Sequence, residues 1–245
     1  MRLDGLDERE VAALAGAPVA WVLDAVTSTM DEAHRRAEAG APSGALVIAN
    51  SQHAGRGRHG RAWTSEPGGG LWMTSIHREV DAVALDCLTI RVGLALAACL
   101  DPLADGPVGL KWPNDVFVGR GKVSGVLTEA RWRSSELQWV AVGVGINIVA
   151  PAAQSGASGL RQGVARRDLL ATVPAAVRAA CAARGELSAA EIRAFAARDV
   201  AAGSTITSPA VGVACGIAPN GALVVETATG RQLCRTGSLV RRSEA

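Results

Sequence analysis

The sequence predicts an α+β protein in which a mixed, largely antiparallel sheet is flanked by helices and followed by a small β-barrel. Apolar runs of strand length alternate with longer helical segments over most of the chain. Strand-like runs between residues 108 and 148 follow one another with short turns, which implies antiparallel pairing. From Gly203 the pattern changes to short β-rich runs separated by turns. We therefore expect two domains, 1–200 and 201–245.

The expected helices have recognisable start and stop signals. Asp7 is a suitable N-cap for a helix over 7–16. Thr29 and Glu32 have the spacing of a capping box, which predicts a helix from about 30 to 39 that stops at Gly40. Further helices are predicted at 83–100, ended by Pro102, at 163–183, kinked by Pro174, and at 188–199. Strands are predicted at 19–24, 44–50, 71–77, 108–118, 123–131 and 137–148.

Composition limits the classes of function. The net charge of +2 gives no global basic field for nucleic acid. Charges, Gly or Pro break every apolar run before the ~20 residues needed to span a bilayer, and the N-terminus lacks the pattern of a signal peptide. We expect a cytoplasmic protein with no membrane partner. The five cysteines lack C-x-x-C spacing, so we expect buried free thiols rather than disulfides or a zinc site.

Residues 55–61, Gly-Arg-Gly-Arg-His-Gly-Arg, form the most informative segment, which we name the Arg–Gly loop. Its glycines match G-x-G-x-x-G, but turn residues and a strand follow where a dinucleotide-binding fold needs a helix. No carboxylate lies between Asn50 and Ser65 to neutralise the three guanidinium groups. Because guanidinium binds phosphate and carboxylate through a fork, the loop is predicted to close over an anion. A solvated basic surface loop is the alternative.

Lysine occurs only at positions 111 and 122, although arginine is abundant. Lys111 ends a strand-like run and precedes Trp112-Pro113-Asn114-Asp115, where Pro113 forces a bend. A lysine held beside a forced bend has little freedom, as a fixed catalytic charge requires. The alternative is an ordinary lysine at a strand edge.

Glycine also interrupts two predicted strands. Gly125 lies inside one of them, and Gly143 and Gly145 lie inside the next. Such glycines mark a bulge or the close approach of a ligand, although packing against bulky neighbours is the alternative. Asn147 follows and offers both a donor and an acceptor to a nucleotide base.

Together these segments resemble the biotin protein ligases. The resemblance covers about residues 21 to 149, whereas 150–200 match poorly, and the tail is similar to the small C-terminal SH3-like domain of that family. The segments that carry it are Ser28-Thr29, Gln52, Gly55 to Trp63, Lys111 to Asp115, Gly125 to Glu129 and Gly143 to Asn147.

The resemblance implies a biotin/lipoate ligase-like fold and an enzyme that joins biotin to AMP from ATP, with Mg²⁺, to form biotinyl-5'-AMP. It also implies transfer of biotin to a lysine of the biotin carboxyl carrier domain of a carboxylase. The segment before Ser28 is too short for a winged helix, so we expect the short form, with no DNA partner.

The resemblance also implies roles for individual residues. Lys111 and Arg58 would be catalytic, and Asp115 is the candidate metal ligand. Biotin would be bound by Ser28, Thr29, Gln52, Arg56, Gly57, Arg58, Lys111 and Gly125. The nucleotide would be bound by Arg58, Arg61, Trp63, Lys111 and Asn147. Two positions depart from the family pattern: Met30 stands where asparagine is common, and His59 replaces a frequent arginine.

These residue types suit the implied chemistry. A carboxylate must attack the α-phosphorus of ATP, and two anions meet only where fixed cations are present. The anhydride product must also be shielded from water, so the loop is expected to act as a lid. The alternatives are a lipoate–protein ligase and a non-catalytic nucleotide- or RNA-binding module that uses the arginines beside Trp63. The low net charge and the scarcity of Tyr and Phe disfavour the second alternative.

Overall fold

The structure is a computed structural model and describes residues 2–242. Its helices are α1 (Glu8–Ala15), α2 (Thr29–Glu38), α3 (Leu85–Leu100), α4 (Arg166–Leu170), α5 (Val173–Ala182) and α6 (Ala189–Ala196), with short 3₁₀ turns η1 (Arg58–Gly60) and η2 (Asp101–Leu103). Its strands are β1 (Ala20–Val26), β2 (Leu46–Gln52), β3 (Gly70–His77), β4 (Val108–Lys111), β5 (Asp115–Val118), β6 (Gly121–Arg133), β7 (Glu136–Asn147), β8 (Thr205–Ser208), β9 (Gly212–Ile217), β10 (Leu223–Thr227), β11 (Gly230–Cys234) and β12 (Val240–Arg241).

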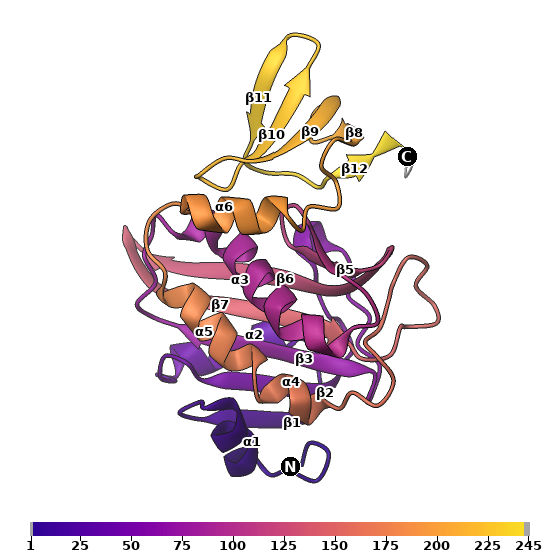
Figure 1. Cartoon of the computed structure of the whole chain (residues 1–245). Coiled ribbons are helices and arrows are strands. Elements are labelled where there is room, and N and C mark those ends of the chain that lie inside the picture. Colours follow the sequence, from indigo (N-terminus) through magenta and orange to yellow (C-terminus); the bar gives the residue numbers. More distant parts are fainter. Residues whose placement is uncertain (1, 243–245) are drawn as a thin grey trace.

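The main body is built on a seven-stranded sheet with strand order β1-β2-β3-β7-β6-β5-β4 (Figure 1). Strands β1 and β2 run parallel, and each other neighbouring pair is antiparallel. The long hairpin of β6 and β7 forms the centre of the sheet. The predicted mixed, largely antiparallel sheet flanked by helices is confirmed.

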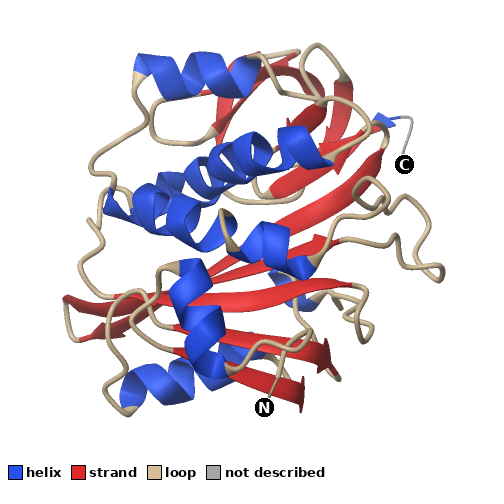
Figure 2. Ribbon diagram, turned by 60° about the horizontal axis from the view of Figure 1, so that its bottom comes forward, coloured by secondary structure: helices blue, strands red, loops and turns tan. Residues whose placement is uncertain are grey.

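Helices cover both faces of this sheet, with α3 and α5 on one side and α2 on the other (Figure 2). Successive side chains of β2 therefore point to opposite faces of the sheet, and both faces are buried. Leu46 and Ile48 belong to the large core cluster that includes α3 and α5, whereas Val47 packs with Ala33 and Ala37 of α2. All eight residues of β3 are buried for the same reason.

The helix signals are confirmed in part. Asp7 caps α1 by accepting from the backbone N–H groups of Arg9 and Glu10. Helix α2, however, is capped by Ser28, so the predicted Thr29 capping box is wrong by one residue. Thr29 cannot serve because its hydroxyl bonds Gln52 and Thr74, in the sheet.

Two predicted elements are each divided in the structure. The helix expected over 163–183 consists of α4 and α5, and Pro174 lies in the first turn of α5, where no backbone N–H is required, rather than at a kink. The strand expected over 108–118 reverses at the cis Trp112–Pro113 bond, so that Lys111 of β4 faces Asp115 of β5. The bend expected at Pro113 is thus a complete turn.

The five cysteines are free, and three of them are buried. Cys99 is half-buried and Cys215 is exposed, so the expectation of burial is wrong for Cys215. The alternation of β9 explains its exposure, because Ala214 points into the core of the small sheet and its neighbour must point outward.

The C-terminal segment forms a second antiparallel sheet, with order β11-β10-β9-β8-β12, which stands against α6 (Figure 1). The expected second β-unit is confirmed as an antiparallel sheet, but the expected closure into a barrel is not observed, since no pairing within residues 2–242 joins β11 to β12. The indole N–H of Trp112 donates to Gly221 O at 2.9 Å and thereby links the two sheets. The division into domains at residue 200 stays a prediction. Across the described residues, no helix combines the length and apolar character needed to cross a bilayer.

Candidate active site

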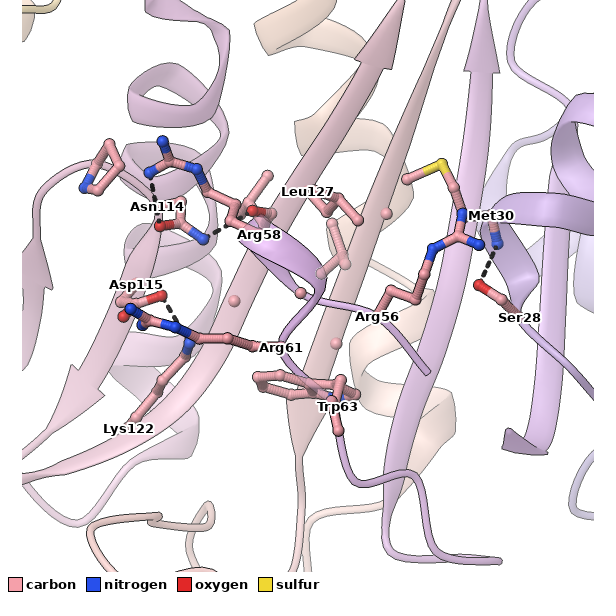
Figure 3. A pocket seen from close by; sticks show the side chains of 18 of the residues that line it. Ser28, Met30, Arg56, Arg58, Arg61, Trp63, Asn114, Asp115, Lys122 and Leu127 are labelled. Atoms are coloured by element: carbon pink, nitrogen blue, oxygen red, sulfur yellow. Dashed lines mark hydrogen bonds and ion pairs between the residues drawn. The ribbon is translucent and has the colours of Figure 1, made fainter. Parts of the chain in front are cut away.

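A cavity of about 290 Å³ lies between the glycine-bearing strands β6 and β7 and the Arg–Gly loop (Figure 3). The predicted site residues that line it are Ser28, Thr29, Gln52, Arg56, Gly57, Arg58, Arg61, Trp63, Lys111, Asp115 and Gly125. Ser238 and Leu239 of the C-terminal segment complete the wall. Lys111 and the Arg–Gly loop, separate in sequence, therefore share one cavity.

Asn147 does not line this cavity. It lines a neighbouring hollow with Trp72 and Glu66, and its buried amide lies 3.5 Å from Lys122 O. The sequence places Asn147 at the end of β7, where its backbone pairs with Gly70.

Glycines in β6 and β7 allow Trp63 to lie directly on the sheet. A Cβ atom at Gly145 would come within 2.6 Å of the indole ring, and one at Gly125 would come within 3.2 Å. These glycines therefore accommodate a bulky neighbour, Trp63, which is the alternative to a bound ligand, and the approach of a ligand to them stays a prediction. The ring meets Trp72 edge-on, with 6.3 Å between centroids, and its Nε1 is buried with no partner in the described part of the chain.

One end of the cavity is a buried polar cluster at the start of α2. Gln52 Oε1 accepts from the Thr29 backbone N–H at 2.8 Å and from the Thr29 hydroxyl at 3.1 Å. Gln52 Nε2 donates to Ser65 Oγ at 2.7 Å, which fixes the orientation of the amide. The buried side chain of Met30 adds an apolar wall, and its Cε approaches the floor at Gly143. This end can therefore bind a group that is partly polar and partly apolar.

The Arg–Gly loop is folded as a small hairpin over the cavity. Gly57 N–H donates to Arg61 O at 2.8 Å, and Trp63 N–H donates to Gly55 O at 2.8 Å. His59 adopts a left-handed conformation, with φ of 57°, at the tip of the hairpin. The side chains of the loop separate: Arg58 and Arg61 lie on the side of Asn114 and Asp115, whereas Arg56 points the other way, towards α2 (Figure 3).

The opposite end of the cavity is strongly cationic. Arg58, Arg61, Lys111 and Lys122 line it, and Asp115 is the one carboxylate among its described lining residues. Lys122 Nζ lies 2.6 Å from Asp115 Oδ1 and 5.2 Å from the centroid of the Trp63 ring. Burial lowers the pKa of the Arg58 guanidinium, Asp115 acts against this shift, and the nearby Arg61 adds to it. This excess of positive charge would favour an anion in the cavity.

Lys122 is the site residue that sequence reasoning missed. In the sequence it follows Gly119-Arg120-Gly121, a position typical of an ordinary turn residue. The scarcity of lysine could have indicated it, because the sequence has only two lysines. Both of them line the cavity. The register of β5 on β6, in which Asp115 faces Gly125, explains why Lys122 reaches the same place as Lys111.

The fold and the cavity define a protein in which an arginine-bearing hairpin and two lysines surround a cavity that could accept an anion beside a buried polar subsite. Residues 22–147 match the model of the biotin/lipoate A/B protein ligase family. The chain belongs to this family.

Similar proteins agree with this assignment. The bifunctional ligase/repressor BirA of Bacillus spizizenii is 36% identical over 126 residues, which are 51% of this chain and 39% of that protein. The biotin--[acetyl-CoA-carboxylase] ligase of Mycobacterium tuberculosis is 38% identical over 154 residues, 58% of this chain and 56% of that protein. The chain thus spans about two fifths to just over half of the length of these two relatives.

Solved structures share the fold over most of the chain. The biotin protein ligase from Aquifex aeolicus in complex with biotin and ATP has a TM-score of 0.74 and 24% identity, covering 91% of this chain and 98% of that one. The ligase from Leishmania major in complex with biotinyl-5-AMP has a TM-score of 0.62 and 26% identity, covering 91% and 99%. The predicted fold class is therefore confirmed.

Proposed function

We propose that this chain is a biotin–protein ligase, which activates biotin with ATP to biotinyl-5'-AMP and transfers the biotin to a lysine of a biotin carboxyl carrier domain. The observation that carries the proposal is a single cavity in which a buried polar subsite adjoins a cationic end formed by two arginines of the Arg–Gly loop and the lysines 111 and 122. The relatives described above are biotin ligases, which supports the same substrate for this chain.

In the first step an oxygen of the biotin carboxylate attacks the α-phosphorus of ATP, the new P–O bond forms and pyrophosphate leaves. Both reactants are anions, so their approach depends on cations placed before the reaction begins. Lys111 and Lys122 supply ammonium groups from the sheet, and Arg58 and Arg61 supply guanidinium groups from the loop. We assign catalytic roles to Lys122, Lys111 and Arg58.

The two ends of the cavity suit the two substrates. Ser28, Thr29 and Gln52 offer hydroxyl and amide groups to a ureido ring, and Met30 offers a thioether wall to the apolar part of biotin. Trp63 provides a flat ring beside the cations, on which a nucleobase can pack. Asn147 would contact the nucleotide from the neighbouring hollow.

ATP is expected to react as its Mg²⁺ complex, and one residue of the cavity could hold this ion. Mg²⁺ in nucleotide sites is held by phosphate oxygens and one or two carboxylates, and Asp115 is the carboxylate that lines the cavity. Asp115 is ion-paired to Lys122, so it would exchange that partner when the metal–nucleotide complex binds. The ion would supply additional positive charge at the phosphates.

In the second step the deprotonated amine of the carrier lysine attacks the acyl carbon, an amide bond forms and AMP leaves. The anhydride must survive until the carrier arrives, and the hairpin over the cavity excludes water during this interval. The carrier domain and a cytoplasmic location stay predictions.

The decisive experiment incubates the full chain with ATP, Mg²⁺, biotin and a purified carrier domain, and measures the mass of the carrier. We expect the mass gain of one biotin amide, with pyrophosphate exchange that depends on biotin. Exchange supported by lipoate but not by biotin would instead identify the lipoate–protein ligase. Salt-sensitive RNA binding without ATP turnover would replace both enzymes with the binding module.

A further inference from the structure

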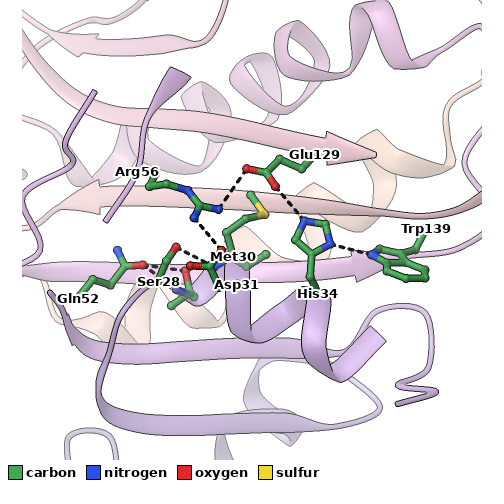
Figure 4. Close-up of polar contacts among 10 residues, drawn as sticks. Ser28, Met30, Asp31, His34, Gln52, Arg56, Glu129 and Trp139 are labelled. Atoms are coloured by element: carbon green, nitrogen blue, oxygen red, sulfur yellow. Dashed lines mark hydrogen bonds and ion pairs between the residues drawn. The ribbon is translucent and has the colours of Figure 1, made fainter. Parts of the chain in front are cut away.

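Five side chains next to the cavity form a continuous series of hydrogen bonds and ion pairs (Figure 4). Asp31 and His34 come from one face of α2, Glu129 from β6, Trp139 from β7 and Arg56 from the Arg–Gly loop. We name these five residues the Arg56 clamp. The series joins the loop to the centre of the sheet.

Arg56 lies between two carboxylates. Its Nη1 is 2.7 Å from Asp31 Oδ1, and its Nη2 is 3.4 Å from Glu129 Oε1. The other arginines of the loop differ, since Arg58 and Arg61 face the cationic end of the cavity. The charge of Arg56 is therefore neutralised by the protein itself, and its side chain is available for attachment rather than for binding an anion.

The rest of the clamp fixes Glu129. The indole N–H of Trp139 can only donate, and it donates to His34 Nδ1 at 3.0 Å. Nδ1 must then be an acceptor, so the hydrogen of the neutral ring is on Nε2, which donates to Glu129 Oε2 at 3.0 Å. Each carboxylate oxygen of Glu129 thus faces one donor, His34 or Arg56. His34 and Trp139 are both buried, so this support is rigid.

We propose that Asp31 and Glu129 are positioning residues, which hold the Arg–Gly hairpin closed over the cavity by gripping Arg56. This inference rests on the proposed function, and it assigns the control of the lid to two carboxylates that do not line the cavity. Arg56 is on the first leg of the hairpin and forms an isolated bridge with Ala62 on the second leg. Fixing Arg56 therefore fixes both legs, including the segment that carries Trp63.

A clamp of this kind suits a glycine-rich segment. Glycine loses more conformational freedom on ordering than any other residue, and the loop has three glycines. Single exposed ion pairs contribute little, but here two carboxylates share one guanidinium, and a buried histidine orients one of them. Loss of both carboxylates would leave the backbone bonds of the hairpin, the hydrogen bond of Arg58 to Asn114 and the packing of Trp63 to hold the loop in place.

The test compares Asp31→Asn/Glu129→Gln with a matched control, Glu32→Gln. Glu32 is on the same helix and holds two arginines, Arg35 and Arg36, but does not touch the loop. In the double variant we expect trypsin to cut between residues 55 and 63 about tenfold faster than in wild type, without substrates present. We also expect adenylate to escape about tenfold faster and the KM for biotin to rise, while kcat for pyrophosphate exchange changes less than threefold.

The control variant is expected to keep the wild-type rates of cleavage and escape, as measured at equal folded fractions by circular dichroism. A double variant with wild-type cleavage and wild-type adenylate retention overturns the clamp. If the double variant does not fold, Asp31→Asn alone decides, because Asp31 is half-exposed and its loss breaks the shorter contact. Proteolysis needs no catalysis, so an inactive wild-type chain would reject the proposed function and leave the test of the clamp intact.

Discussion

Gly145→Ala tests whether the floor of the cavity determines the position of Trp63. A Cβ at residue 145 would lie 2.6 Å from Cε2 and Nε1 of the indole and 2.8 Å from Cζ2. Non-bonded carbons settle ~3.5–4.0 Å apart, so the ring must move away by roughly 1 Å. The ring belongs to the Arg–Gly hairpin and the methyl belongs to a central strand, so the hairpin is the part that moves.

The expected cost follows from the contact area of the ring. A fully buried indole of about 200 Å² contributes about 5 kcal/mol at 25 cal/mol per Å², and Trp63 is half-buried. A gap of 0.5–1 Å removes a quarter to a half of the contact energy, which leaves a loss of about 1 kcal/mol. We expect the melting temperature to fall by about 2–4 °C and the KM for ATP to rise about five- to tenfold.

The assay is biotin-dependent pyrophosphate exchange at varied ATP, with thermal unfolding of the same samples. Gly93→Ala in α3 is the matched control, since its Cβ would meet only Leu110 Cδ2 at 3.5 Å, an ordinary contact. That change should leave the KM for ATP unaltered and stabilise the helix by about 0.5–1 kcal/mol. A Gly145→Ala protein with the wild-type KM for ATP and melting temperature would refute the assigned position of Trp63.

Four further substitutions test other parts of the molecule. Lys122→Ala should reduce biotin-dependent pyrophosphate exchange by at least about a hundredfold with an unchanged melting temperature, and Lys111→Ala should do the same; near wild-type exchange in either variant removes that residue from the mechanism. Trp112→Phe should lower the free energy of unfolding by about 2–4 kcal/mol in urea, because Gly221 O loses its donor and the ring leaves space, and a loss below measurement error would contradict the link between the sheets. Burial lowers the pKa of His77 to about 4, below its value in the unfolded chain, so protonation at low pH favours unfolding. The free energy of unfolding of the wild-type protein should therefore fall by about 2–3 kcal/mol between pH 7 and pH 4.5 through His77, and His77→Gln should lack this part of the decrease.

Local chemistry made much of the fold predictable. The capping of α1, the glycine and proline punctuation and the apolar periods depend on residues close in sequence, and the structure places elements near each expected range. The errors fall where a distant partner decides. Thr29 fits the pattern of an N-cap, but its hydroxyl is hydrogen-bonded to Gln52 and Thr74. Ser28 therefore caps the helix, one residue before the predicted cap.

The candidate site was predictable to the same extent. The order of the motifs in the sequence predicted that the Arg–Gly loop and Lys111 share one site. It did not predict that the three arginines of the loop point in different directions. Arg56 turns towards Asp31 because α2 and β6 place two carboxylates beside it, which depends on the packing of helix on sheet. Lys122 was missed because its approach to the cavity depends on the register of β5 on β6, which no local pattern encodes.

The distribution of charge explains how such a cationic cavity is compatible with a folded protein. Five positive side chains line one cavity and repel one another, and this repulsion is screened less than it would be at a free surface. Asp115 lies against Lys122 at 2.6 Å and offsets part of that repulsion, while Arg56 is removed from the sum by its own two carboxylates. An incoming phosphate therefore competes with one carboxylate for Lys122, and the full cationic field acts only after that exchange. Asp115→Asn should consequently tighten the binding of free pyrophosphate and, at the same time, destabilise the empty protein, two effects of opposite sign that a purely structural role for Asp115 would not produce.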